Sequence, residues 1–181
     1  MKKDTEEALK VGGLVLLTYL IVNSMKAATP TQTIHEYNVA NKASVNSNVR
    51  AVRNLNPGNV RHSGDAWQGM TGQDDKGFCQ FNTADNGTRC MVKLLRNYSA
   101  NRGLDTIKTV IDRYAPSSEN DTNSYVKVIA SRMGLPETQG LNLKTDANNL
   151  ASLAYYMHIH EAGFAWVEYD VFLKWAKEFT K

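Results

Sequence analysis

A single carboxylate closes an apolar helical pattern near the end of the chain, in the stretch LASLAYYMHIHEAG at residues 150–163. Spacings of three and four residues place Leu153, Met157 and Glu161 on one face of a helix expected over 147–161. Apolar surroundings and the negative end of the helix dipole both disfavour the ionised carboxylate, so both raise its pKa. A carboxyl group that stays protonated near neutral pH can act as a general acid. Glu161 is therefore the candidate catalytic acid; the alternatives are a carboxylate that escapes to solvent or one that pairs with an arginine.

Glu119 is in the opposite electrostatic setting, just before the amino terminus of an expected helix. Backbone N–H groups at that end stabilise an anion and lower the carboxyl pKa, which suits a cap or an ion pair better than a general acid. Glu119 is thus a candidate for a second catalytic carboxylate that stays charged, and Asp65 and Asp75 are further candidates. None of the three has surroundings that match those of Glu161.

Three histidines, His62, His158 and His160, could form a metal site together with Glu161, and two cysteines add further reactive side chains. His158 and His160 lie on the expected helix, where residues i and i+2 point about 200° apart, so the two rings cannot aim at one zinc ion. Cys79 and Cys90 either form a disulfide or remain as half-buried thiols. A cysteine nucleophile activated by a histidine would require the two side chains to lie within hydrogen-bonding distance, and the sequence does not indicate this. We expect neither a metal site nor a cofactor.

The stretch RNLNPGNVRHSGDAWQG, residues 53–69, is the most distinctive block of the chain. Its Pro-Gly pair predicts a turn. The asparagines around that turn, including Asn56 and Asn59, either satisfy exposed backbone groups or bind sugar hydroxyls and amides. Trp67 can stack on the apolar face of a sugar or pack in the core.

The elements that must position these residues fall in residues 49–181. Between residues 53 and 81, glycines and short apolar pieces predict turns and a small antiparallel sheet. From residue 86 onward the apolar spacing becomes helical. Stop and cap signals divide this part into helices. The expected stops are Gly103, Pro116 and Gly134, the expected caps are Asp105 or Thr106 and Asp146, and a final helix begins near Asp170. The expected fold class is α+β, mostly α, with a small β lobe in front.

The amino-terminal part contains an uncharged apolar segment, residues 11–25, between Lys10 and Lys26. A helix of this length reaches about 22 Å, slightly short of a bilayer core, and snorkelling lysines extend the span. A secretory signal peptide is the alternative, but acidic residues precede the segment and small residues are missing at the cleavage positions. We expect a short polar amino end over 1–10 on the positive-inside side, a single transmembrane helix over 11–25 and a flexible linker over 26–48.

The charge balance is mild overall and uneven along the chain. A formal net charge of +3 does not argue for nucleic acid. Residues 49–116 hold ten Lys and Arg against six Asp and Glu, whereas residues 117–181 hold six against eight. The front lobe is thus the cationic part, which suits an anionic polymer such as the cell wall; a solvated surface has the same composition.

Several short motifs follow one another in a fixed order, and their combination is more specific than any one of them. They are RNLNPGNVR at 53–61, WQG at 67–69, FCQF at 78–81, GTR at 87–89, YAPSSENDT at 114–122 and HEAG at 160–163. In this order they resemble a family of phage and bacterial proteins that includes virion structural proteins and lysozyme-like enzymes. The last two motifs are also similar to blocks of cell-wall glucosaminidases and lytic transglycosylases, whose catalytic Glu ends a helix before a small residue and Gly.

The resemblance implies a lysozyme-like domain that cleaves the β-1,4 glycan strand of peptidoglycan, with Glu161 as the acid. A lytic transglycosylase manages with one carboxyl group, because the 6-hydroxyl of the substrate closes an anhydro ring, whereas a hydrolytic muramidase needs a second carboxylate. We favour the first. The residues expected to line the glycan cleft or bind the substrate are Asn56, Asn59, Arg61, Trp67, Tyr114, Tyr125 and His160.

The apolar segment and the resemblance together imply a membrane-anchored protein of a phage virion, located in an internal membrane. The expected partners are peptidoglycan, a lipid membrane and other virion proteins, but not nucleic acid. One alternative is a non-catalytic virion membrane protein that binds cell wall or capsid. Another is a cellular wall-remodelling enzyme in the bacterial inner membrane, facing the periplasm.

Overall fold

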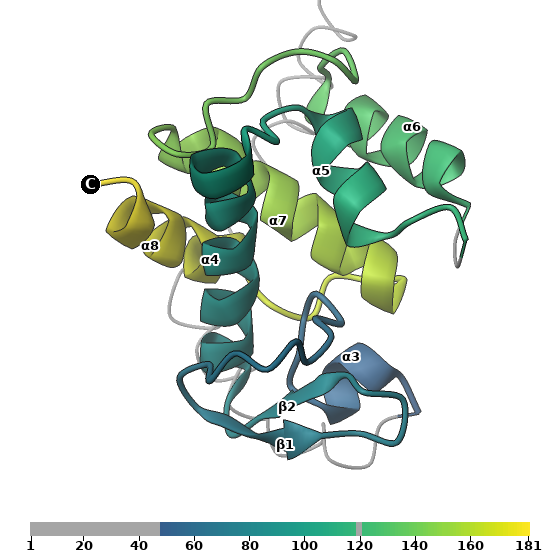
Figure 1. Ribbon diagram of the computed structural model, residues 1–181, viewed down its shortest axis with the longest axis vertical. Helices are drawn as coiled ribbons and strands as arrows, with labels where there is room; N and C mark the ends of the chain where they lie inside the picture. The colour runs from purple at the N-terminus through teal and green to yellow at the C-terminus, as the bar shows by residue number, and fades with distance from the viewer. Residues whose placement is uncertain (1–47, 119–120) are drawn as a thin grey trace, which may run out of the picture. The chain divides into compact units, whose positions relative to one another are not determined.

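The structure, a computed structural model, describes residues 48–118 and 121–181 (Figure 1). The segment expected to span a membrane, the expected linker up to residue 47 and the candidate carboxylate Glu119 lie outside the described residues. Within the described ranges, no helix combines the length and apolar character that a membrane span requires.

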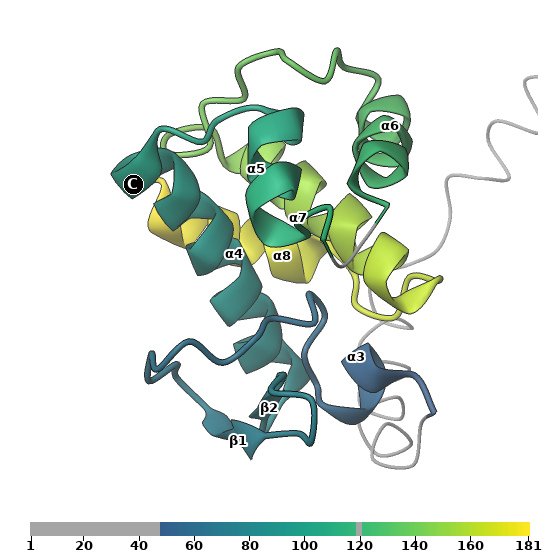
Figure 2. The same cartoon turned by 45° about the vertical axis from the view of Figure 1, so that its right-hand side comes forward.

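The described part is mostly helical with one small sheet, as the sequence predicted. A short helix and a two-stranded antiparallel sheet form a small lobe, and five longer helices follow (Figures 1 and 2). The small lobe consists of α3 (Arg50–Arg53), β1 (Met70–Gln73) and β2 (Cys79–Phe81). The helical part consists of α4 (Ala84–Arg102), α5 (Ile107–Tyr114), α6 (Thr122–Met133), α7 (Ala147–Ala162) and α8 (Tyr169–Phe179).

The turn between β1 and β2 is built around Asp74. Its Oδ1 accepts the backbone N–H groups of Lys76 and Phe78, and its Oδ2 accepts a hydrogen bond of 2.8 Å from Asn54 Nδ2. Burial acts to raise the Asp74 pKa, but these donors and Arg50 hold it below its ordinary value. The charged Asp74 therefore ties the sheet to α3, which carries Arg50.

Local cap signals set most helix ends. Thr106 caps α5 and Asp146 caps α7, while Gly103 and Gly134 end α4 and α6 in the left-handed conformation, as predicted. Helix α4 begins at Ala84, two residues earlier than the apolar pattern suggested, because Thr83 accepts a hydrogen bond from the Asn86 backbone as its cap.

Helix α7 runs through the middle of the helical part, with α4 and α8 on one side and α5 and α6 on the other (Figure 1). It packs against α4, α6 and α8 and also against α3 of the small lobe. Leu150, Leu153 and Met157 on its predicted apolar stripe are fully buried. Cys79 and Cys90 are both buried free thiols, so of the two open possibilities the unpaired one holds.

Candidate active site

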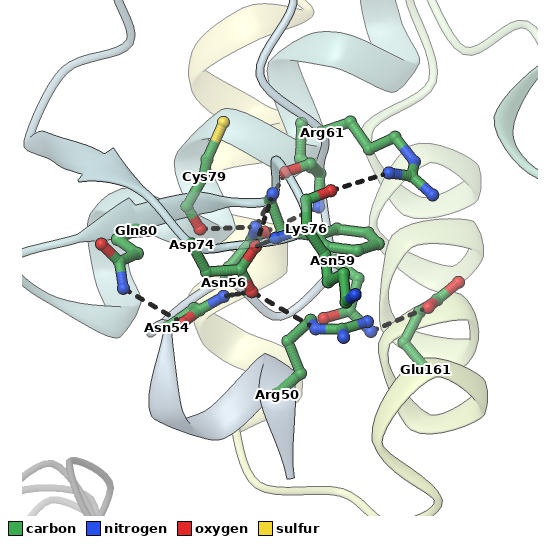
Figure 3. A network of polar contacts seen from close by, with 12 residues as sticks. Arg50, Asn54, Asn56, Asn59, Arg61, Asp74, Lys76, Cys79, Gln80 and Glu161 are labelled. Atoms are coloured by element: carbon green, nitrogen blue, oxygen red, sulfur yellow. Dashed lines mark hydrogen bonds and ion pairs between the residues drawn. The ribbon is translucent and has the colours of Figure 1, made fainter.

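The candidate acid Glu161 lies in the last turn of α7, just before the capping residue Gly163. Its Oε2 accepts a hydrogen bond of 3.0 Å from Asn59 Nδ2, and its Oε1 accepts one of 3.0 Å from the Tyr125 hydroxyl. Figure 3 shows Asn59 reaching from the small lobe toward the carboxylate at the end of the helix. Segments that lie 102 and 36 residues away in the sequence therefore hold this one side chain.

The electrostatic setting of Glu161 favours the protonated carboxyl. Burial raises its pKa, while the hydrogen bonds from Asn59 and Tyr125 lower it and offset part of that effect. The net shift is upward, in the direction that the apolar helix predicted. Among the ion pairs that join described residues, none includes Glu161, so the alternative of an arginine-neutralised carboxylate is not what this part of the chain shows.

A tight loop aims Asn59 at the carboxylate. Leu55 and Asn59 have φ values of 50° and 47°, a left-handed conformation that asparagine tolerates better than most residues. Between them, Gly58 accepts a hydrogen bond from the Tyr114 hydroxyl through its carbonyl. A Cβ at Gly58 would overlap with that hydroxyl and lie 2.8 Å from the Met91 sulfur, so this close approach requires glycine.

Asn56 stabilises the same loop from inside. Its side chain is fully buried. Its Oδ1 accepts a hydrogen bond of 2.9 Å from the Val60 backbone, and its Nδ2 donates to the carbonyl oxygens of Val60 and Cys79 at 3.0 and 2.9 Å (Figure 3). The expectation that Asn56 contacts a substrate is wrong, because the side chain has no exposed surface. It fixes the loop that carries Asn59.

Tyr125 and His160 form the other side of the carboxylate. Tyr125 on α6 is 3% exposed, and its ring stacks on that of His160 with centroids 3.7 Å apart and an angle of 17° between the planes. Burial, with a further contribution from Arg132, lowers the His160 pKa below its ordinary value, so the ring is neutral at neutral pH. The stack fixes the direction of the Tyr125 hydroxyl toward Glu161.

Two surface hollows meet at Glu161. The larger has a volume of about 680 Å³, and the smaller has a volume of about 280 Å³. Glu161 lines both, whereas Asn59 lines only the larger and Tyr125 only the smaller. Glu161 is therefore the residue that the two hollows share.

The larger hollow contains three more of the predicted binding residues. Trp67 is half-buried there, and its indole N–H is buried without a hydrogen-bond partner in the described part. Tyr114 lines the hollow beside the Gly58 loop. Arg61 is exposed, with its guanidinium 4.4 Å from the Phe78 ring centroid. Asn59, Arg61, Trp67 and Tyr114 are thus brought together with Glu161, and Tyr125 and His160 join it from the smaller hollow.

The candidates for a second carboxylate differ in position. Asp65 lines the larger hollow and accepts a hydrogen bond of 2.7 Å from Ser63. Asp75 is exposed on the turn after β1 and lines neither hollow. Asp121, the cap of α6, lines the smaller hollow and was not among the candidates.

His158 belongs to the core. Its Nδ1 lies 2.7 Å from the Tyr155 carbonyl oxygen, and its Nε2 accepts the backbone N–H groups of Trp166 and Val167 at 3.3 and 3.5 Å. Burial lowers the pKa of His158 to about 4, so the ring is neutral and holds the turn between α7 and α8. Nowhere in residues 48–118 and 121–181 do three His, Cys, Asp or Glu side chains come together as a metal site would require.

Sequence reasoning missed the residues of the larger hollow that come from the helices. They are Leu94, Tyr98, Arg102 and Arg113, and Arg50 joins them from α3. No local motif marks these residues, since each lies on an ordinary amphipathic or capping position. The only signal was the general excess of Lys and Arg in residues 49–116.

The chain is 37% identical over 105 residues to Protein P5 of Pseudoalteromonas phage PM2. The alignment covers 56% of this chain and 66% of the phage protein, just under two thirds of its length. No protein-family model matches the chain. The chain is therefore similar to a bacteriophage protein whose name carries no activity.

Proposed function

We propose that this protein cleaves the β-1,4 glycan strand of peptidoglycan, with Glu161 as the general acid and base. The observation that carries the proposal is the position of Glu161 where two hollows meet, with its carboxyl group held by Asn59 and Tyr125 and its pKa raised by burial. A glycan chain that crosses this point would have sugars on both sides of the reacting bond.

In the proposed reaction, the Glu161 carboxyl gives its proton to the glycosidic oxygen as the bond to the anomeric carbon breaks. The carboxylate that forms accepts hydrogen bonds from Asn59 and Tyr125, and these donors stabilise the new charge. Glu161 then takes the proton of the attacking hydroxyl as the new bond to the anomeric carbon forms, which returns the acid to its starting state.

The attacking hydroxyl in this proposal is the 6-hydroxyl of the same sugar, so the product carries an anhydro ring. This lytic transglycosylase route needs a single carboxyl group. It is favoured because the other described carboxylates at the hollows, Asp65 and Asp121, are exposed and unlike Glu161 in their surroundings. A muramidase would instead give reducing ends through water.

The biological setting is part of the same proposal. Similarity to a phage protein and the apolar segment 11–25 support a protein anchored in the internal membrane of a phage virion that opens the host wall during infection. In this proposal the domain is lysozyme-like, and its partners are peptidoglycan, the membrane lipids and neighbouring virion proteins.

The test is cleavage of purified peptidoglycan by the full chain in detergent micelles, with the products identified by mass spectrometry. The Glu161→Gln variant should be at least ~100-fold slower, as loss of a general acid predicts. The matched control is Glu168→Gln, which removes an exposed glutamate that lies just after the same helix and outside both hollows. Equal rates for wild type and Glu161→Gln would overturn the assignment of Glu161 as the acid. No cleavage by the folded wild type would instead support the alternative of a non-catalytic virion protein that binds cell wall or capsid.

A further inference from the structure

The larger hollow has a cationic end that the proposed reaction does not use. Arg102 lies in the last turn of α4 and Arg113 in the last turn of α5, and both line the hollow beside Tyr98. Both guanidinium charges act on the Tyr98 hydroxyl: burial raises its pKa, while Arg113 and Arg102 lower it. Two arginines from different helices and this tyrosine therefore line the same hollow, and the charges of both arginines reach the tyrosine hydroxyl.

These two arginines are not used by ion pairs inside the described part of the chain. The carboxylate next to Arg113 is Asp112, and it pairs with Lys108 at 2.7 Å. The ion pairs among described residues include neither Arg102 nor Arg113. Both side chains are exposed, so their donors face the hollow and the solvent.

We infer that Arg102 and Arg113 bind a carboxylate of the glycan substrate while Tyr98 supports the sugar ring that carries it. A guanidinium group presents donors in a planar fork that matches a carboxylate, and an aromatic face suits the apolar face of a sugar. Peptidoglycan carries carboxylates on its stem peptides, and on lactyl groups to which no peptide is attached, whereas chitin has none. The pair would thus select an acidic, substituted strand over a neutral one.

This inference rests on the proposed function for its substrate, but not on Glu161 being the acid. A purely structural explanation is that both arginines only complement the carbonyl end of their helices. Lys177 offers a matched control for that explanation, because it is an exposed cation in the last turn of α8 and lines neither hollow.

The experiment measures binding of soluble peptidoglycan strands to the full chain in micelles, with Glu161→Gln present in every protein so that turnover does not interfere. Each protein is titrated with strands that keep their carboxylates and with strands whose carboxylates have been converted to amides. The Arg102→Gln/Arg113→Gln variant should bind the carboxylate strands about 10- to 100-fold more weakly and the amidated strands unchanged. Lys177→Gln should bind both as its parent does.

Three outcomes would overturn the inference. They are equal losses on both kinds of strand, equal binding by parent and double variant, and no binding of either strand by the folded parent. Cleavage by the wild type is followed separately on the same strands. If the wild type cuts the strands but the double variant binds them normally, the arginine inference fails and the proposed activity stands. If the wild type cuts nothing but the arginines give a preference for carboxylate strands, the proposed activity fails and the arginine inference stands.

Discussion

Asn56 and Asn59 are three positions apart in the same loop but bond to different partners, so substitutions at each should separate stability from site chemistry. Asn56→Ala leaves the Val60 N–H without an acceptor among the described residues and removes a donor from two buried carbonyl oxygens. A buried unsatisfied group costs about 1–3 kcal/mol and each lost hydrogen bond about 0.5–1.5 kcal/mol. Together these terms predict a loss of about 2–6 kcal/mol in the free energy of unfolding.

That loss is a large part of the stability of an ordinary domain, which is about 5–15 kcal/mol. The matched comparison is Asn59→Gly, because glycine accepts the left-handed backbone at this position and the change removes a half-buried side chain with one hydrogen bond, to Glu161. We expect Asn59→Gly to lower the free energy of unfolding by about 0.5–1.5 kcal/mol, the value of one hydrogen bond. Urea denaturation of both variants, followed by circular dichroism, gives the two values.

The reasoning is refuted if Asn56→Ala loses less than about 1 kcal/mol, or if Asn59→Gly is the more destabilising of the two. Either result would mean that the Asn56 contacts do not hold the loop. A complementary variant, Asn56→Asp, keeps the shape but replaces the donor with an acceptor, and it should be at least as destabilising as Asn56→Ala because two carbonyl oxygens would face a carboxylate.

Three further predictions follow from groups with shifted pKa values. Because the folded pKa of Glu161 is raised, the contribution of this residue to wild-type stability falls as the pH rises from its ordinary pKa to the folded one. Glu161→Gln should therefore be no more stable than wild type at acid pH and more stable at neutral pH, and thermal unfolding of both proteins across this pH range checks the difference. Tyr125→Phe removes a donor that lowers the Glu161 pKa, so carboxyl titration by NMR should show that pKa rise, and a fall or no change would contradict the hydrogen bond. Since the His158 pKa is lowered from 6.5 to about 4, the contribution of His158 to stability should be constant above pH 6.5 and drop by about 3 kcal/mol as the pH falls to 4. Urea denaturation across this pH range measures the drop, and its absence would mean that the ring is solvated in the folded protein.

Local signals in the sequence predicted much of the helical part. The cap at Asp146 and the stop at Gly134 act through neighbouring backbone groups, so their meaning does not depend on the rest of the fold. The apolar stripe on α7 ends at Glu161 as the spacing indicated, and burial raises its pKa as that position implied. These features follow from chemistry within one or two helical turns.

The roles of the two loop asparagines could not be separated from sequence, because residue type and motif are the same for both. The backbone conformation of the loop decides which side chain turns inward to Val60 and which outward to Glu161. The position of Arg102 and Arg113 at the hollow could not be predicted from the sequence for a related reason, because this hollow forms only when α4 and α5 have packed. Long-range placement of this kind leaves no local trace.

The 102-residue separation between Asn59 and Glu161 also has a consequence for the newborn chain. Protein synthesis proceeds from the amino end at about 5–20 residues per second, so Glu161 is added roughly 5–20 s after Asn59. The small lobe and α6 are therefore synthesised before α7, the helix against which α4, α6 and α8 pack. A truncated or stalled chain that lacks α7 therefore carries the Asn59 loop and Tyr125 without the carboxylate that both of them contact in the complete fold.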